Sequence, residues 1–269
     1  ITKDGVTFHL NSKGGRKKYQ ITPEKCIQIQ FDIGSDIMIL LDYFTPFNAK
    51  DEEIKLSVDW TIEWGKRCKD EFEKQCKMRK LNDSTRPHLF GVVQGAHNKN
   101  ERERCAVELE KIGFDGYGLG GWTFNDEGEI DLDIIEHIAN VTPGTKPRYG
   151  LGIGNPQALV DCVRLGYGIF DCVLPTRDAR HERLYVFKKD PKEIKDIYSE
   201  KDWYEYLYIS REKYVRDGGP ISKFCDCHAC RNYNLSYLHH LFTIGDSLAW
   251  RLATIHNLRM YSMIMDLCN

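Results

Sequence analysis

Three cysteines within six positions are the densest group of chemically active side chains in this 269-residue chain. Cys225, Cys227 and Cys230 in "KFCDCHACRNY" follow the spacing C-x-C-x2-C, which lets three thiolates converge on one tetrahedral ion. Thiolates favour zinc over hard cations, so one Zn²⁺ is expected. A site closed by a fourth protein ligand would be structural and would fix a small lobe. Spacing alone leaves that ligand open among His228, His239, His240, His256 and Cys268.

Carboxylate and amide side chains stand at the ends of several apolar runs. "FDCVLPTRDARH" places Asp171 where a carboxylate loses water unless something binds it, so it is either a nucleophile or a turn cap paired with Arg177. Asp42 ends "IMILLD" and Gln94 ends "FGVVQ". Together with the backbone of Gly120–Gly121, these groups offer the acceptors and donors that match the edge of a purine.

Repeated βα units are predicted to position these groups. Each apolar run ends in a polar or glycine-rich corner, and helical patterning follows, which indicates a parallel sheet with its chemistry at the carboxyl ends of the strands. The five runs are 36–46, 88–96, 114–122, 148–156 and 167–177, and the helical stretches are 51–79, 99–112, 130–139 and 156–166. In the first helix, Glu71 and Gln75 are expected on a solvated face.

The pattern changes after Arg183. "RLYVFKK" predicts a short hairpin strand, and a charged and aromatic segment, the cysteine cluster and further helices follow. The pattern predicts βα units up to about residue 180 and an inserted subdomain over 181–257.

Composition limits the partners and the compartment. With 38 Lys and Arg against 40 Asp and Glu, any nucleic-acid site must be a local basic patch. The seven cysteines outside the cluster lie in apolar or helical segments, which is typical of a reduced protein. The sequence has no signal segment and no apolar run of membrane-spanning length, so a cytoplasmic protein without membrane contact is expected.

Six motifs in order carry a resemblance that covers nearly the whole chain. "GVVQG", "DGYGLGGW", "PRYGLGIG", "FDCVLPTRDAR", "CDCHACRNY" and "YLHHL…TIHNLR" resemble the tRNA-guanine transglycosylases, which exchange bases in queuosine biosynthesis. The resemblance implies a TIM-type (β/α)8 barrel with a zinc subdomain inserted near its C-terminal end. It thus implies a partial α/β barrel over 1–180, a zinc-binding subdomain over 181–257 and the start of a C-terminal barrel helix over 258–269. It also implies replacement of guanine at the tRNA anticodon wobble position by a 7-deazaguanine.

The resemblance also implies residue roles. Asp171 matches the nucleophile that attacks the ribose and holds the RNA covalently. Asp42, Gln94 and Gly121 match base-recognition positions, and Leu151 matches the apolar floor of the pocket.

Further matches concern the metal and the RNA. Cys225, Cys227, Cys230 and His256 match the zinc ligands, which selects His256 from the open candidates. Arg177 and Arg180 match positions that contact the anticodon loop, where guanidinium groups suit phosphates and splayed bases. Family members commonly form homodimers, which is expected here for the full-length protein.

The sequence departs from the family pattern in a missing motif, in residues of the pocket and in the greater length of 181–224. The family's general acid/base aspartate lies in a "DSGG"-type motif upstream of everything present, so the five runs would be barrel strands four to eight of a longer protein, or a partner would supply the rest. Tyr43-Phe44 replaces a common Glu-Cys, and Trp122 replaces a common leucine beside the substrate. These aromatic groups leave open whether a small aminomethyl precursor (preQ1) or queuine is accepted.

Three alternative readings remain. "GYGLGG" at 116–121 satisfies the dinucleotide pattern G-x-G-x-x-G, but Trp122–Gly128 is turn-like, so no helix follows directly. A non-catalytic or split subunit of the same family would act with a partner, although the presence of Asp171, Asp42 and Gln94 argues against it. A paralogue acting on DNA is the third.

Overall fold

The structure is a computed structural model that describes residues 1–12, 15–125 and 129–269. The predicted turn at 122–128 therefore lies partly outside the described residues. The chain divides into two compact units, the first comprising 1–151 with 165–169 and the second 152–164 with 170–269.

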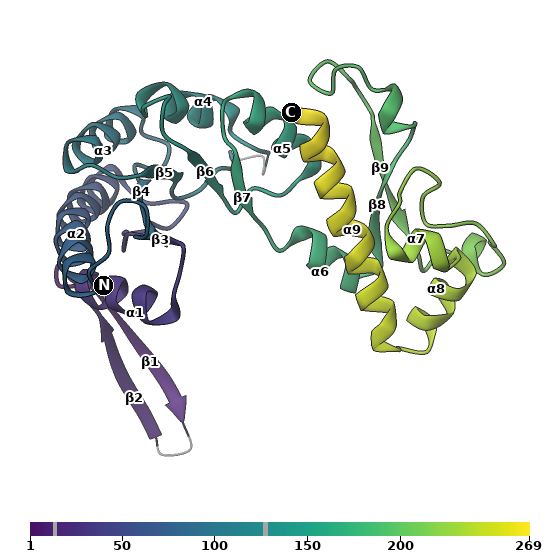
Figure 1. Cartoon of the computed structure of the whole chain (residues 1–269), viewed down its shortest axis with the longest axis horizontal. Helices are drawn as coiled ribbons and strands as arrows, with labels where there is room; N and C mark the ends of the chain where they lie inside the picture. The colour runs from purple at the N-terminus through teal and green to yellow at the C-terminus, as the bar shows by residue number, and fades with distance from the viewer. Residues whose placement is uncertain (13–14, 126–128) are drawn as a thin grey trace. The chain divides into compact units, whose positions relative to one another are not determined.

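The first unit begins with an antiparallel ribbon of two strands and continues as alternating strands and helices (Figure 1). Its strands are β1 (Val6–Ser12), β2 (Gly15–Ile21), β3 (Ile37–Ile39), β4 (His88–Val93), β5 (Gly116–Leu119) and β6 (Arg148–Leu151). Its helices are α1 (Pro23–Ile33), α2 (Asp51–Met78), α3 (Lys99–Ile112) and α4 (Leu132–Val141). Helices α2 and α3 both pack on β4.

The central sheet has the strand order β3-β4-β5-β6-β7, where β7 is Ile169–Asp171. The first four strands pair in parallel, for example Phe90 with Gly116 and Tyr117 with Arg148. The order follows the sequence without a reversal, which is the arrangement of successive strands in a β/α barrel. The predicted parallel α/β sheet is confirmed, and each strand is shorter than its apolar run. The run 167–177 contains not only β7 but also the start of a helix, Leu174–Arg180, that was not predicted.

Helix ends are fixed by local signals. Helix α1 begins after Thr22, whose hydroxyl accepts from the Lys25 N–H, and ends at Gly34 in a left-handed conformation with φ +79°. Helix α3 begins after Asn98, whose side chain accepts from the Glu101 N–H. Because Asn98 follows β4 by only five residues, this cap also determines where the β4–α3 loop ends.

One expectation about α2 is wrong. Glu71 and Gln75 are buried, not solvated, because α1 packs along this face of α2. The Glu71 carboxylate accepts hydrogen bonds from Gln28 (2.9 Å) and Gln75 (2.7 Å) and pairs with Lys74 (3.1 Å). The charged residues of α2 suggested exposure, but the carboxylate of Glu71 can be buried because these three partners satisfy it.

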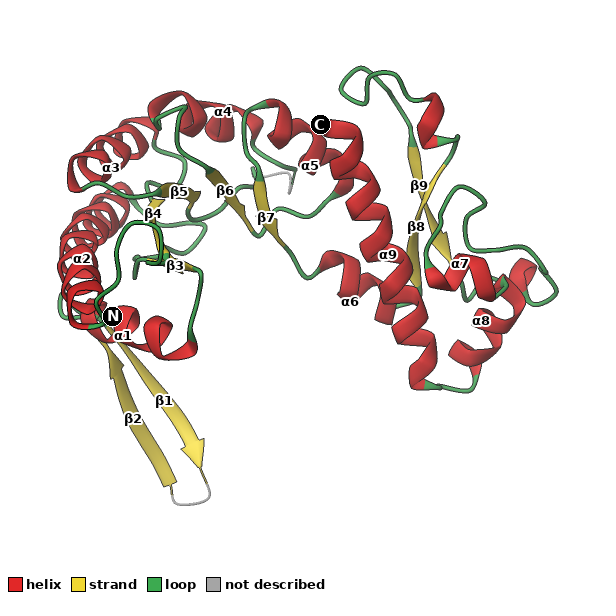
Figure 2. Ribbon diagram, in the orientation of Figure 1, coloured by secondary structure: helices red, strands yellow, loops and turns green. Residues whose placement is uncertain are grey.

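The second unit joins a hairpin to five α-helices (Figure 2). Its helices are α5 (Pro156–Arg164), α6 (Leu174–Arg180), α7 (His228–Asn232), α8 (Leu235–Thr243) and α9 (Ser247–Cys268), with 3-10 turns η1 (Pro191–Glu193) and η2 (Glu212–Tyr214). The predicted hairpin strand is β8 (Arg183–Phe187), which pairs antiparallel with β9 (Tyr204–Tyr208). Helix α9 runs without a break through residues 257 and 258, between which the sequence analysis placed the end of the zinc-binding subdomain.

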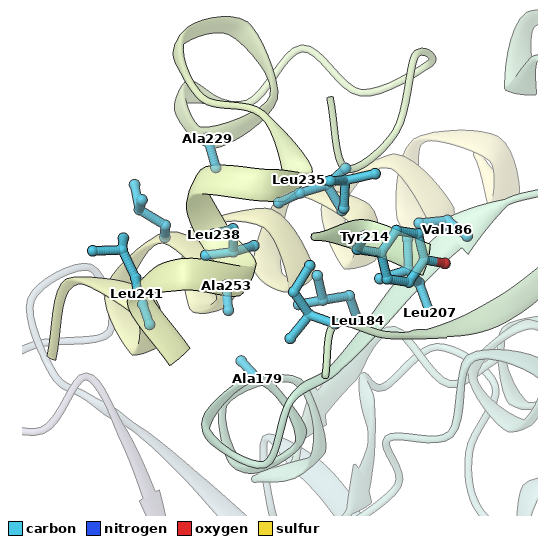
Figure 3. Packing of buried hydrophobic residues seen from close by; sticks show 14 of the residues in the cluster. Ala179, Leu184, Val186, Leu207, Tyr214, Ala229, Leu235, Leu238, Leu241 and Ala253 are labelled. Atoms are coloured by element: carbon cyan, nitrogen blue, oxygen red, sulfur yellow. The ribbon is translucent and has the colours of Figure 1, made fainter. Parts of the chain in front are cut away.

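Helix α9 is the centre of the second unit and packs on α5, α6, α7, α8 and β8. Figure 3 shows the cluster in which Ala179 of α6 and Ala253 of α9 face Leu184 of β8 and Leu238 of α8. The small alanine side chains let α6 and α9 approach closely. In the described part of the chain, no helix has the length and apolar character needed to cross a membrane.

Candidate active site and metal centre

Asp42 and Gln94 meet at the carboxyl ends of β3 and β4. Gln94 follows β4 directly and is fully buried, and its Nε2 donates to Asp42 Oδ2 at 2.5 Å. The Asp42 side chain keeps some solvent access although protein atoms surround it densely. This desolvation raises the pKa of Asp42 above its ordinary value, and the hydrogen bond from Gln94 opposes the rise.

The glycine pair after β5 makes room for the Gln94 amide. A methyl group on Gly120 would lie 2.7 Å from Gln94 Nε2, and one on Gly121 would lie 3.1 Å from Gln94 Oε1. Gly121 also has φ +79°, a conformation that suits glycine. Asp42, Gln94 and Gly121 thus lie at one corner of the sheet, which we call the base corner.

Arg102 supports this corner, and the sequence analysis missed it. The side chain is fully buried on α3; its Nε donates to the Ala96 carbonyl (2.8 Å), and its Nη1 donates to those of Val93 and Gly120 (both 2.5 Å). Burial lowers the pKa of the guanidinium to about 10. A signal was present, since Arg102 shares helical spacing with the buried Cys105, Ala106 and Leu109.

Two buried polar atoms at the base corner are unpaired. Among the described residues, Gln94 Oε1 and Arg102 Nη2 have no hydrogen-bond partner, and both lie beside Gly121. Buried groups left unpaired cost free energy, and they are rare enough in native proteins to need an explanation. A ligand that paired with both atoms would supply a donor for the amide oxygen and an acceptor for the guanidinium N–H, and would thereby remove this cost.

Aromatic rings flank the base corner. Trp122 donates from Nε1 to the Thr45 carbonyl (3.0 Å), and its ring centre lies 5.3 Å from that of Phe44 and 5.8 Å from that of Phe47. Trp122 and Phe47 line a cleft of about 470 Å³ together with Asn48, Ala49, Ala96, His97, Phe124, Asn125, Asp131 and Ile134. Tyr43 instead stacks on Trp60 of α2. Of the two unusual residues 43 and 44, Phe44 is therefore the one in contact with Trp122.

Leu151 ends β6, the strand next to β5. It is half-buried, and its Cδ1 would lie 3.0 Å from a methyl group on Gly118 of β5. Leu151 therefore packs on the strand that leads to the glycine pair.

Asp171 belongs to the second unit and ends β7. Its side chain is exposed, and its Oδ1 accepts from the Gly152 N–H at 3.1 Å. Arg177 and Arg180 are exposed on the following helix α6, three residues apart and therefore on neighbouring positions of its surface. Arg177 Nε lies 3.9 Å from Asp178, so the ion pair found for Arg177 is with Asp178 and not with Asp171.

The four predicted metal ligands come together in the second unit. Ligand atoms of Cys225, Cys227, Cys230 and His256 all lie within 4.8 Å of one another. His256 Nδ1 is 3.3 Å from Cys230 Sγ and 3.8 Å from Cys227 Sγ. Three sulfurs and one imidazole nitrogen are the donors of a tetrahedral structural site for a soft ion. The cluster can therefore hold a metal ion.

Neighbouring groups orient these ligands. His256 is buried, and its Nε2 lies 2.8 Å from the Tyr185 carbonyl, which leaves Nδ1 to face the sulfurs. Cys227 caps α7 and accepts from the Cys230 N–H. Hydrogen bonds from Cys225 and Cys230 lower the pKa of the Cys227 thiol, which favours a thiolate.

Comparison with known proteins assigns a family to this combination of a parallel β/α sheet and a Cys3His cluster. The family model described as queuine tRNA-ribosyltransferase matches residues 1–268. Proteins named queuine tRNA-ribosyltransferase from Psychrobacter cryohalolentis and Aliivibrio fischeri are 37% and 39% identical to this chain over 266 and 265 residues, or 99% and 98% of it.

The chain therefore belongs to the queuine tRNA-ribosyltransferase family, as the resemblance predicted. It spans 64% of the length of each of these two relatives.

Proposed function

We propose that the protein to which this chain belongs is a tRNA-guanine transglycosylase, which exchanges guanine at the wobble position of a tRNA anticodon for a 7-deazaguanine. The observation that carries the proposal is the Asp42–Gln94 pair beside Gly121, with an unpaired amide oxygen and an unpaired guanidinium N–H next to it. Membership of the queuine tRNA-ribosyltransferase family and the name of its relatives support the same reaction class.

The base corner would recognise the purine edge. An ionised Asp42 accepts from the ring N–H and the exocyclic amine of guanine, whereas Gln94 and the Gly121 backbone reach its carbonyl side. Leu151 would form the apolar floor. Trp122 would contact the substituent at position 7, so its ring helps to decide whether preQ1 or queuine is accepted.

Asp171 is proposed as the nucleophile. Its carboxylate oxygen forms a bond to ribose C1′ while the glycosidic bond breaks, and the bond's electron pair leaves with the purine, which is protonated. The incoming 7-deazaguanine loses a proton, attacks the same carbon and releases the Asp171 carboxylate. An acid/base group is needed for both proton transfers, and the family supplies it from a segment before these residues.

The metal and RNA contacts complete the proposal. One structural Zn²⁺ would be held by Cys225, Cys227, Cys230 and His256. It would link the segment 225–230 to α9 and would take no part in the reaction. Arg177 and Arg180 would contact the anticodon loop.

The complete protein would form a (β/α)8 barrel in which β3 to β7 are strands four to eight and 181–257 is the zinc subdomain. It would act as a cytoplasmic homodimer.

Incorporation of radiolabelled guanine into a tRNA transcript tests the reaction. The full-length protein should incorporate label, Asp171→Asn should abolish incorporation, and Asp161→Asn, a change in the same unit on α5, should leave it intact. Label incorporated by Asp171→Asn at the wild-type rate would remove Asp171 from the reaction. An absence of incorporation by the wild type would instead favour a non-catalytic subunit that needs a partner, or a DNA substrate.

A further inference from the structure

The β1–β2 ribbon presents an exposed apolar face. Its register places Phe8 opposite Tyr19 and Leu10 opposite Lys17, so these four side chains share one face. Phe8 and Tyr19 are each 48% exposed, and Leu10 is 56% exposed. In the described part of the chain, neither strand pairs with any strand but the other. The ribbon thus carries two half-exposed aromatic rings directly opposite each other across its strands.

The ribbon is also basic. Strand β2 has the sequence "GRKKYQI", and neither strand contains an acidic residue, whereas the whole chain has a net charge of −2. Lys17 lies on the aromatic face, and Lys18 lies opposite His9 on the other face. All three side chains are exposed. A local basic patch of this kind can attract a polyanion to a chain whose net charge is negative.

The root of the ribbon is fixed to α2. Trp64 Nε1 donates to the Lys3 carbonyl at 2.7 Å, and Trp64 is itself fully buried. Gly5, with φ +136°, allows a close approach, because a methyl group there would lie 2.2 Å from the Ile21 carbonyl oxygen. The two strands therefore leave a packed base together, and the aromatic and basic side chains lie beyond it.

We infer that this ribbon is an RNA-binding arm. Unpaired bases stack on exposed aromatic rings, and lysines beside the rings bind the phosphates between those bases. An added protein strand fits less well, because lysines on an edge strand oppose strand pairing. The identity of the RNA as a tRNA rests on the proposed function, and the contact made by the arm lies outside the base corner.

Fluorescence titration of the full-length protein tests the arm, with a labelled tRNA transcript and a labelled isolated anticodon stem-loop as probes. Phe8→Ala/Tyr19→Ala should weaken tRNA binding about tenfold or more, which corresponds to one lost base–aromatic stack. Lys17→Ala/Lys18→Ala should lower the slope of log affinity against log salt by about 0.7, because Lys17 is the one of the two that lies on the aromatic face. The matched control Lys55→Ala/Lys77→Ala removes two exposed lysines of α2 and should leave the slope unchanged.

A photo-reactive phenylalanine in place of Tyr19 provides a second test, since it does not depend on a loss of binding. It should cross-link to the tRNA, whereas the same group in place of Ile33, which is 73% exposed, should not. The inference would be overturned if both double variants bound tRNA with the affinity and salt slope of the control variant, and if position 19 gave no cross-link. A variant that changes the oligomeric state at unchanged RNA affinity would overturn it in favour of a protein interface.

These outcomes are separate from the reaction test. The arm should bind RNA in Asp171→Asn as in the wild type, so a failed base exchange leaves the arm testable. Conversely, unaltered RNA binding in the ribbon variants, with base exchange intact, would reject the arm alone.

Discussion

The base corner and the Cys3His cluster differ in how completely the chain satisfies its own polar groups. The cluster brings four donors within 4.8 Å of one another, and the Tyr185 carbonyl faces the second nitrogen of its histidine. At the base corner, Gln94 Oε1 and Arg102 Nη2 are left without partners among the described residues. The cluster is thus a set of ligand atoms suited to one metal ion, whereas the base corner leaves one hydrogen-bond acceptor and one donor unpaired.

This difference separates the roles of the two sites. Four protein ligands leave no position on the ion for substrate, so a metal there contributes to folding. The base corner holds unpaired groups and a desolvated carboxylate, which cost stability and are typical of binding sites. Changes at the cluster should therefore damage the fold, whereas changes to Asp42 should damage binding.

Loss of the metal should have the largest effect. Elemental analysis should find about one zinc per chain in the wild type, and His256→Ala should lose it, because structural zinc contributes on the order of 10 kcal/mol to folding. The lobe of the second unit around α7 should then unfold, which protease sensitivity measures. His240→Ala, an exposed residue of α8, is the matched control. Zinc retained by His256→Ala would exclude this histidine as a ligand.

Arg102→Met should have the next largest effect. The change keeps a long side chain but leaves the carbonyls of Val93, Ala96 and Gly120 without a donor, at a cost of at least ~3 kcal/mol in unfolding free energy. Arg104→Met on the same helix loses only partly exposed ion pairs with Asp59 and Glu101, and should cost less than ~1 kcal/mol. Chemical denaturation measures both. Equal losses would show that Arg102 is not the support of the corner.

Asp42→Asn should weaken guanine binding by at least ~1–3 kcal/mol and alter its pH dependence. Desolvation raises the pKa of Asp42 above 3.8, so guanine affinity should fall on acidification at a higher pH than for an ordinary aspartate. The free energy of unfolding should instead rise on acidification over the same pH range. The folded state holds the proton more tightly, so Asp42 costs stability as the pH rises from 3.8 through its folded pKa. Calorimetry should find neither trend in Asp42→Asn. Identical pH profiles for the wild type and Asp42→Asn would contradict the assignment of Asp42 to guanine recognition.

Trp122→Leu should have the smallest effect. The variant loses the ring contacts with Phe44 and Phe47 and the hydrogen bond to Thr45, which lie beside the pocket and not within the Asp42–Gln94 pair. Guanine affinity should change by less than ~1.5 kcal/mol, while the preference among 7-substituted deazaguanines should shift. Competition between preQ1 and queuine measures this, and an unaltered preference would place the substituent away from Trp122.

The local features of the fold and site could be predicted from sequence, and the non-local ones could not. The apolar runs and helical patterning predicted β3 to β7 and α2 to α5 but not the β1–β2 ribbon, α1 or α6, and C-x-C-x2-C predicted three of the four cluster residues. Spacing left the fourth ligand open because His256 follows Cys230 by 26 residues, and only the family resemblance selected it. Burial of Glu71 depends on Gln28 from another helix, which no local pattern reveals, whereas the helical spacing of Arg102 with buried apolar residues was a local signal that the sequence analysis missed.

The central proposal is that the Asp171 carboxylate bonds to the ribose of the RNA during base exchange. Trapping the RNA adduct of the full-length protein under denaturing conditions, followed by peptide mapping, tests it most directly. The account predicts one nucleotide adduct on the peptide that contains Asp171, lost in Asp171→Ala and retained in Asp161→Ala. An adduct on another residue, or one that persists in Asp171→Ala, would contradict it.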